Sequence, residues 1–195
     1  MAIVSVLAVT DQAVYDESAK PAPDNPVPDE KDWTWVLDQA CPECGFDART
    51  VSGRDVPAIV RDAVIRWGPV LRRSDAAQRP GPQVWSALEY GCHVRDVFAR
   101  FDSRARLMLA EDDPLFENWD QDATALADRY WEQAPATVAV QLADAGEQIA
   151  ATFDAVDGAE WQRTGRRSNG SVFTVDSLGK YFAHDIVHHL ADVQA

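Results

Sequence analysis

Three of the chain's four histidines lie within six residues near the C-terminus, at positions 184, 188 and 189. If this segment is helical, His184 and His188 are one turn apart and project from the same face. Two imidazoles at i and i+4 on a helix can fill two ligand positions of a divalent metal ion. The fourth histidine, His93, lies in another helix-like segment and can supply a third ligand. The sequence therefore favours a three-histidine metal site with open positions.

A second pattern that could bind metal is the C-x-x-C pair Cys41 and Cys44. It has three interpretations: a structural turn, a partial metal site, or a redox pair. A closed zinc site needs four ligands, normally from a second pair of this kind, and the sequence has no second C-x-x-C. Cys92 is the one further cysteine, so the three interpretations stay open.

Carboxylates accompany the histidines. Glu89 precedes His93 by one helical turn and has the spacing from Ser86 of a capping box. It can cap the helix, hold a ligand imidazole in place, or act as a catalytic base. Asp185 and Asp192 either orient imidazole N–H groups or lie on an exposed face.

Residues 163–171 are rich in turn-forming residues and locally basic. Arg166 and Arg167 in this segment have two interpretations. They belong to a solvated loop, or they bind a carboxylate of a thiol cofactor or substrate near the metal.

The overall composition limits the function. The chain has 195 residues, 46% of them apolar, which fits one domain or one domain with an appendage. The net charge of −14 argues against a nucleic-acid or anionic membrane partner. Three cysteines do not suggest a disulfide framework, and the apolar start of the chain lacks a basic segment. We therefore expect a cytoplasmic protein.

The elements that must position these residues are helices. Apolar residues recur at helical spacing in four segments, and the turn-forming Gly68-Pro69 kinks or ends the first of them. Thr174 is the expected N-cap of the last one. No run shows several alternating strands, so a four-helix bundle is predicted. The four expected helices cover about residues 55–72, 84–109, 122–156 (broken near Pro135 and ended by Asp157-Gly158) and 174–193.

The N-terminal residues have a different character. Four prolines fall between positions 21 and 28, a density that excludes a helix or an interior strand. We predict an irregular arm over residues 1–50 that packs on the bundle, and a bundle over residues 51–195.

The pattern of the two histidine-bearing segments resembles a known family. Trp85-Ser86-x-x-Glu89-x-x-x-His93 opening the second helix, with His184-x-x-x-His188 on the last, resembles the DinB-like superfamily of metal-binding four-helix bundles. This superfamily includes thiol-dependent S-transferases and mycothiol-dependent maleylpyruvate isomerases. The segment from Gly165 to Val175 and the last helix resemble an actinobacterial-type branch. The resemblance covers about residues 50–195.

The resemblance implies an all-α, up-down-down-up bundle, often a homodimer, with a divalent metal ion held by His93, His184 and His188. Family members vary in where the last-helix pair falls, and a shift by one residue selects Asp185 and His189 instead. The first set is preferred because three imidazoles suit zinc, nickel or iron. His189 also lies about 100° around the helix from His188, so the two do not share a face.

The function implied by the resemblance is a thiol-dependent transferase or isomerase with mycothiol as the co-substrate. A metal ion lowers the pKa of a bound thiol or water, and the resulting nucleophile attacks a small electrophile. The alternatives are a metal-dependent hydrolase and a non-enzymatic, stress-associated metal-binding bundle. The expected partners are a small-molecule electrophile or thiol, with no nucleic acid and no membrane.

Overall fold

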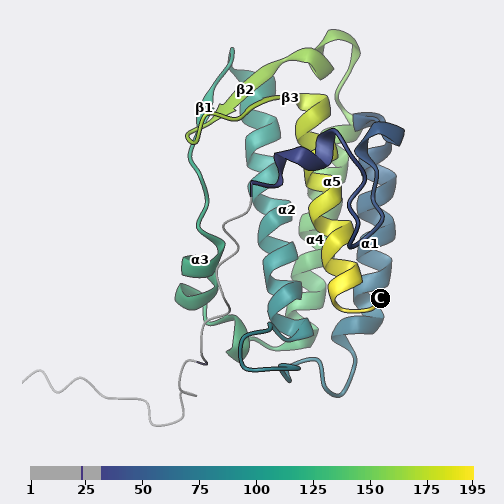
Figure 1. Ribbon diagram of the computed structural model, residues 1–195, viewed down its shortest axis with the longest axis vertical. Coiled ribbons are helices and arrows are strands. Elements are labelled where there is room, and N and C mark those ends of the chain that lie inside the picture. The colour runs from purple at the N-terminus through teal and green to yellow at the C-terminus, as the bar shows by residue number, and fades with distance from the viewer. Residues whose placement is uncertain (1–22, 24–31) are drawn as a thin grey trace, which may run out of the picture.

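The computed structural model describes residue 23 and residues 32–195, so the rest of the predicted arm lies outside the described residues. Four long helices run side by side and form a bundle (Figure 1). Helices α1 and α2 each pack against both α4 and α5. The bundle helices are α1 (Val56–Leu71), α2 (Ala87–Ala110), α4 (Pro135–Asp154) and α5 (Val175–Asp192).

The directions of the helices confirm the up-down-down-up arrangement. Helices α1 and α5 begin at the same end of the bundle, and α2 and α4 begin at the other (Figure 1). A hydrogen bond joins the starts of α1 and α5, because the Gly53 N–H donates to Asp176 Oδ1 at 2.7 Å.

The beginnings of the two histidine-bearing helices follow from local chemistry. Ser86 accepts the Glu89 N–H and the Glu89 carboxylate accepts the Ser86 N–H, a capping box at the start of α2. Thr174 caps α5 by accepting the Ser177 N–H, as the sequence predicts. Helix α1 passes through Pro69 and ends at Leu71, so the proline lies in its last turn.

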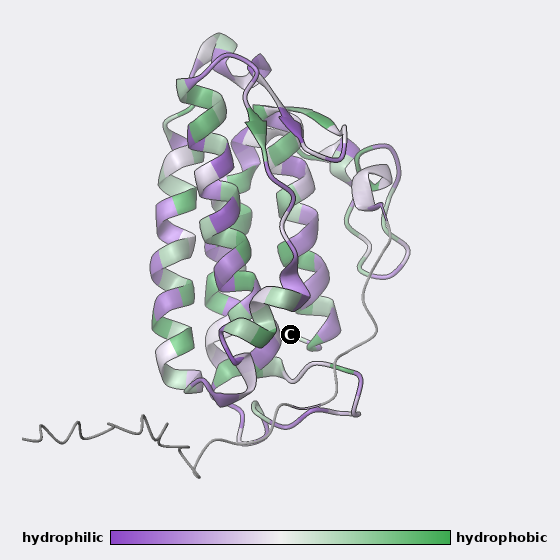
Figure 2. Cartoon of the chain, turned by 90° about the vertical axis from the view of Figure 1, so that its left-hand side faces the viewer, coloured by the Kyte–Doolittle hydropathy of each residue, from purple (hydrophilic) through white to green (hydrophobic). Residues whose placement is uncertain are grey.

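The core between the helices is aromatic and aliphatic. Trp67, Phe98, Phe153 and Phe182 are all buried, and Phe182 stacks against Phe153 with a centroid separation of 6.2 Å. Figure 2 shows apolar and polar residues alternating along the long helices, as expected of helices that bury one face.

The predicted helix over 122–156 is divided. The chain forms α3 (Gln121–Ala127), a 3₁₀ turn at Tyr130–Glu132, and α4, which begins with Pro135. Proline is accepted in the first turn of a helix, where its missing N–H has no partner to lose, so Pro135 starts a helix here. Helix α4 ends at Asp154, three residues before the predicted stop.

A small three-stranded sheet covers one end of the bundle, where the sequence indicated only loops (Figure 1). β1 (Leu115–Phe116) pairs parallel with β2 (Thr164–Arg167), and β2 pairs antiparallel with β3 (Val172–Thr174). These strands are too short to show an alternating pattern, and β1 finds its partner far along the chain, so local sequence did not reveal them.

The segment before the bundle lies against α5 (Figure 1). It contains 3₁₀ turns at Trp33–Leu37 and Ala48–Thr50, and a further one at Gly53–Asp55 precedes α1. The division into an arm over 1–50 and a bundle over 51–195 stays a prediction. Among residues 23 and 32–195, none of the helices combines the length and apolar character needed to cross a membrane.

Candidate metal centres

Helix α5 presents metal-binding side chains on two different faces. At 100° per residue, Asp185 and His189 lie about 20–60° around the helix from Phe182, which packs in the core. His184 and His188 lie about 120–160° from Phe182, on the side away from the core. The first pair therefore faces the bundle and the second faces the N-terminal segment.

The inward pair meets the histidine of α2. Donor atoms of His93, Asp185 and His189 all lie within 4.8 Å of one another. His93 Nε2 is 3.7 Å from Asp185 Oδ1, and His189 Nε2 is 3.5 Å from the same oxygen. We call these three residues the bundle cluster.

The bundle cluster contains buried polar atoms that the protein leaves unpaired. Among the described residues, both ring nitrogens of His93 and Oδ1 of Asp185 have no hydrogen-bond partner. Buried polar atoms are normally paired, and unpaired ones require an explanation. Two imidazoles and a carboxylate are a donor set that binds zinc or iron with positions left open, so these residues fit a divalent metal ion.

The surroundings of the cluster fix its ring orientations and charges. His93 is stacked against Trp119, with a centroid separation of 5.5 Å. His189 Nδ1 is 2.8 Å from Asp192 Oδ2, an interaction that directs Nε2 toward Asp185. Burial lowers the pKa of His93 below the usual range, which keeps the ring neutral. Burial opposes ionisation of Asp185, but the neighbouring His93 and His189 lower its pKa overall.

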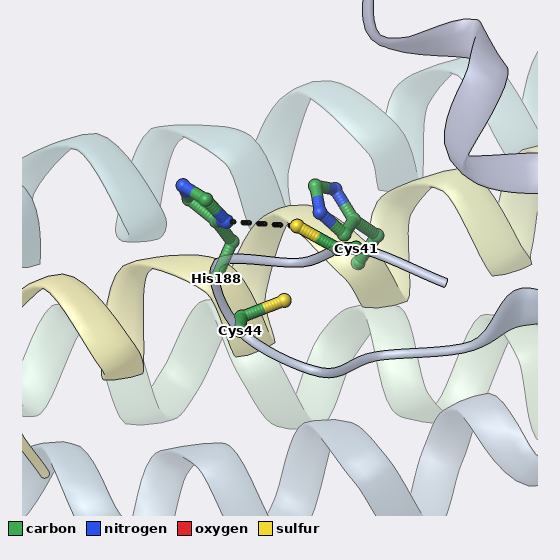
Figure 3. A group of neighbouring side chains, drawn as sticks. Cys41, Cys44 and His188 are labelled. Carbon is green, nitrogen blue, oxygen red and sulfur yellow. Dashed lines mark hydrogen bonds between the residues drawn. The ribbon is translucent and has the colours of Figure 1, made fainter. Parts of the chain in front are cut away.

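The outward pair meets the C-x-x-C turn. Donor atoms of Cys41, Cys44, His184 and His188 all lie within 4.8 Å of one another. Figure 3 shows Cys41 and Cys44 on their loop beside His188 of α5, and Cys41 Sγ is 3.7 Å from His188 Nδ1. We call these four residues the arm cluster. Burial, and then the charge of His188, lower the pKa of His184 to about 4.

The three ligands implied by the resemblance are thus divided between two groups. His93 lies in the bundle cluster, whereas His184 and His188 lie in the arm cluster. The pair that His93 does meet, Asp185 and His189, is the one selected by the one-residue shift. Position around the helix distinguishes the two pairs, and it could be interpreted only once the face of α5 that packs in the core was known.

A cavity of about 680 Å³ opens beside the clusters. Its wall includes Asp185 and His189 of the bundle cluster and His184 and His188 of the arm cluster. A volume of this size accommodates a small-molecule ligand. Asp185 and His189 are therefore accessible to a small molecule.

Two arginines line the same cavity. Arg104, which the sequence analysis did not single out, is only 6% exposed, and its Nε has no hydrogen-bond partner among the described residues. Burial, and then the charges of Arg167 and Arg100, lower the pKa of Arg104 to about 10. Arg167 stands over the ring of Tyr181. Arg166 points elsewhere, with its Nε 3.0 Å from Asp113 Oδ2.

Glu89 is held at the start of α2. It is 1% exposed, and its carboxylate accepts hydrogen bonds from the Ser86 N–H and from the Arg79 guanidinium. It is not among the residues that line the cavity. The structure gives Glu89 the cap that its spacing predicts, and its role as a catalytic base stays a prediction.

Comparisons with known proteins agree with this fold. A family model described as the DinB superfamily matches residues 69–193. Among solved structures, the chain is similar to YfiT from Bacillus subtilis, described as "a probable metal-dependent hydrolase with an unusual four-helix bundle topology". The TM-score is 0.58 at 18% identity, over 86% of this chain and 90% of the other. No curated protein matches. The family match includes the bundle cluster but not Cys41 and Cys44.

Proposed function

The chain belongs to the DinB superfamily, and on that premise we propose that it is a metal-dependent enzyme acting on a small anionic molecule. The divalent metal ion would be held by His93, Asp185 and His189. The observation that carries the proposal is that Asp185 and His189 line a cavity of about 680 Å³, while His93 and Asp185 keep buried polar atoms without a hydrogen-bond partner among the described residues.

The protein's own residues prepare this site. Asp192 interacts with His189 Nδ1 and so favours the tautomer in which Nδ1 carries the proton and Nε2 can act as the metal donor. Trp85 and Trp119 pack against His93 and shield it from water. A divalent ion bound by such donors acts as a Lewis acid and lowers the pKa of a coordinated water or thiol.

Two arginines in the cavity wall support an anionic substrate. The wall also carries six carboxylates, so the basic part is local to Arg104 and Arg167, which contribute two guanidinium groups. A guanidinium binds carboxylates and phosphates through charge-assisted hydrogen bonds. Arg104 lines the cavity, so its guanidinium group can donate to such a group. Arg167 retains its predicted role here, and Arg166 is directed to Asp113 instead.

Thiol transfer is the reaction we propose first. The sulfur of a thiol such as mycothiol would bond to one carbon of an activated C=C bond of the anionic substrate, the π bond would break, and the neighbouring carbon would take up the proton lost from the thiol. Metal-dependent hydrolysis is the second candidate, because YfiT, which shares the fold, is described as a probable hydrolase of that kind. In that case the oxygen of water would bond to the electrophilic centre and the leaving group would take up a proton.

The test compares both reactions in the full chain reconstituted with zinc, nickel, iron or manganese. Unsaturated dicarboxylates would be offered with mycothiol or other low-molecular-weight thiols, and anionic esters and amides without a thiol. We expect turnover of one class, with kcat/KM reduced at least about 100-fold by His93→Ala. The matched control is Asp144→Asn, an exposed carboxylate on α4.

Two results would overturn the proposal. One is full activity in His93→Ala. The other is the absence of any turnover in parent protein that has been shown to contain the metal ion. The second result would favour the non-enzymatic alternative. For the anion site, Arg104→Gln should raise KM about 10-fold without a matching fall in kcat.

A further inference from the structure

We propose that Cys41, Cys44, His184 and His188 form a second, structural zinc site that fastens the N-terminal segment to α5. This inference does not depend on the proposed function, because none of the four residues belongs to the bundle cluster. Two of its four ligands, Cys41 and Cys44, also lie outside the part of the chain matched by the family model, which begins at residue 69.

The spacing of the donor atoms suits a tetrahedral zinc ion. With Zn–S bonds of about 2.3 Å and Zn–N bonds of about 2.0–2.1 Å, tetrahedral ligand atoms lie about 3.3–3.8 Å apart. Cys41 Sγ and His188 Nδ1 are 3.7 Å apart, and all four donors lie within 4.8 Å of one another. Two cysteines and two histidines are a common ligand set of closed structural zinc sites.

The turn between the cysteines directs both sulfurs to the same place. Gly45, with φ of +76°, occupies the left-handed region that glycine adopts without strain. Its N–H donates to the Cys41 carbonyl at 2.8 Å, and the Cys41 N–H donates to the Phe46 carbonyl at 2.8 Å. These two bonds close a tight loop whose side chains face α5 (Figure 3).

The histidines are arranged as ligands. His184 is 4% exposed, and its Nε2 has no hydrogen-bond partner among the described residues. His188 directs Nδ1 to Cys41, while its Nε2 is 3.5 Å from Glu43 Oε2 and 3.9 Å from Asp192 Oδ1. A carboxylate beside the distal nitrogen is the usual companion of a zinc-bound histidine, because it orients the ring and raises its basicity.

Aromatic side chains cover the arm cluster. Trp33 contacts His184 and His188, with ring centroids 5.4 and 5.2 Å away, and Phe46 contacts His184 at 6.0 Å. Four protein ligands leave a tetrahedral ion no open position, so this site would be structural. Both Trp33 and Phe46 belong to the segment that the zinc ion would hold in place.

The same arrangement disfavours the redox-pair interpretation of Cys41 and Cys44. A redox pair needs only the two sulfurs and an accessible thiolate. Here Cys41 is 1% exposed, and two imidazoles of another element converge on the same point. The ligands missing from the sequence interpretation are therefore histidines of α5, about 140 residues further along the chain.

The experiment is cobalt substitution of the full reduced chain, followed by absorption spectroscopy and elemental analysis. A Cys₂His₂ site binds Co²⁺ tetrahedrally and gives a thiolate-to-metal charge-transfer band with intense visible bands. We expect these bands in the parent and their loss in Cys44→Ser. They should persist in Cys92→Ala, which removes a thiol outside the cluster, and in His93→Ala, which alters only the bundle cluster.

Each outcome decides the proposal. Absence of the charge-transfer band from the cobalt-loaded parent would overturn it, and so would an unchanged band in Cys44→Ser. If the band is present and His93→Ala changes neither metal content nor activity, the arm cluster stands and the proposed function fails. If the band is absent and His93→Ala abolishes activity, the reverse holds.

A measurement on the parent alone covers the case in which Cys44→Ser does not fold. The reduced protein would be treated with iodoacetamide and the modified cysteines located by mass spectrometry. Added Zn²⁺ should protect Cys44, which is partly exposed, and a chelator should remove that protection. Cys92, fully buried, should be unaffected by either treatment. Equal modification of Cys44 with and without zinc would contradict the site.

Discussion

The two clusters share one helix and differ by a single residue in register. His184 and His188 belong to the arm cluster, and Asp185 and His189 belong to the bundle cluster. The two residues of each pair lie one turn apart on α5. One residue corresponds to about 100° of rotation, so the pairs look in different directions and meet different partners. Among the described residues, two cysteines complete the arm cluster, whereas His93 alone completes the bundle cluster.

This difference separates two kinds of site. In our proposals, four donors leave a metal ion in the arm cluster no open position, whereas three donors leave an ion in the bundle cluster open positions for a substrate. The cavity reaches histidines of both clusters, so access alone does not separate them. The two remain physically connected, because Asp192 places one oxygen 2.8 Å from His189 Nδ1 and the other 3.9 Å from His188 Nε2. Donor number, more than the presence of histidines, therefore distinguishes the two proposed roles.

Substitution of the neighbouring residues Asp185 and His184 gives the largest expected contrast. Asp185→Ala removes a bundle donor, so kcat/KM should fall at least about 100-fold while the cobalt–thiolate band stays. His184→Ala should remove the band. Kinetics and cobalt spectra on both variants make the comparison, and loss of the band in Asp185→Ala would show that the clusters are not separate sites.

Zinc removal should mainly affect stability through the arm cluster. If the ion contributes about 3 kcal/mol, chelation should lower the melting temperature by about 6–12 °C in a chain of this length. Cys44→Ser should show a lower melting temperature at the outset and only a small further change on chelation. Differential scanning calorimetry provides the measurement. An equal chelator effect in parent and Cys44→Ser would assign the stabilisation to the bundle cluster instead.

Asp192→Asn tests the connection between the clusters. An amide still contacts both imidazoles but no longer provides a negative charge, so the affinity of each site for metal should fall about 10–100-fold. The larger loss is expected at the bundle cluster, where the contact is shorter. Competition titrations with a chelating dye measure both affinities, with Asp144→Asn as the control. A change at one site alone would show that the carboxylate serves only that site.

Local chemistry made much of the fold predictable, and long-range packing explains the rest. The Ser86–Glu89 capping box and the Thr174 N-cap each depend on residues close together in the sequence, and the structure contains both. The ligands that join Cys41 and Cys44 come from the other end of the chain, so no local pattern revealed them. Choosing the register of α5 required knowing which face packs on α2, a question that Phe182 answers only once the core is defined.

Asp102, a buried carboxylate on the same helix as His93, shows how a carboxylate with hydrogen-bond partners differs from the carboxylate of the bundle cluster. Asp102 is 3% exposed and accepts hydrogen bonds from Thr152 Oγ1, from Gln148 Nε2 at 2.7 Å and from Arg106 Nε at 2.8 Å. Asp185 Oδ1, by contrast, has no such partner among the described residues. We therefore expect Asp102 to stabilise the α2–α4 contact without any part in metal binding.

Asp102→Asn should accordingly cost about 1–3 kcal/mol of unfolding free energy and leave metal content unchanged. Burial opposes ionisation of Asp102, but its three hydrogen bonds lower the pKa overall. A carboxyl group whose pKa is lower in the folded state adds stability above its unfolded pKa of about 3.9 and loses it as the pH falls further. Parent and variant should therefore differ at neutral pH in urea unfolding and converge in acid. If the difference in unfolding free energy between parent and variant stayed constant down to the folded pKa, the charge of the carboxylate would contribute nothing to stability. If the variant lost bound metal, Asp102 would not differ from Asp185 in the way proposed.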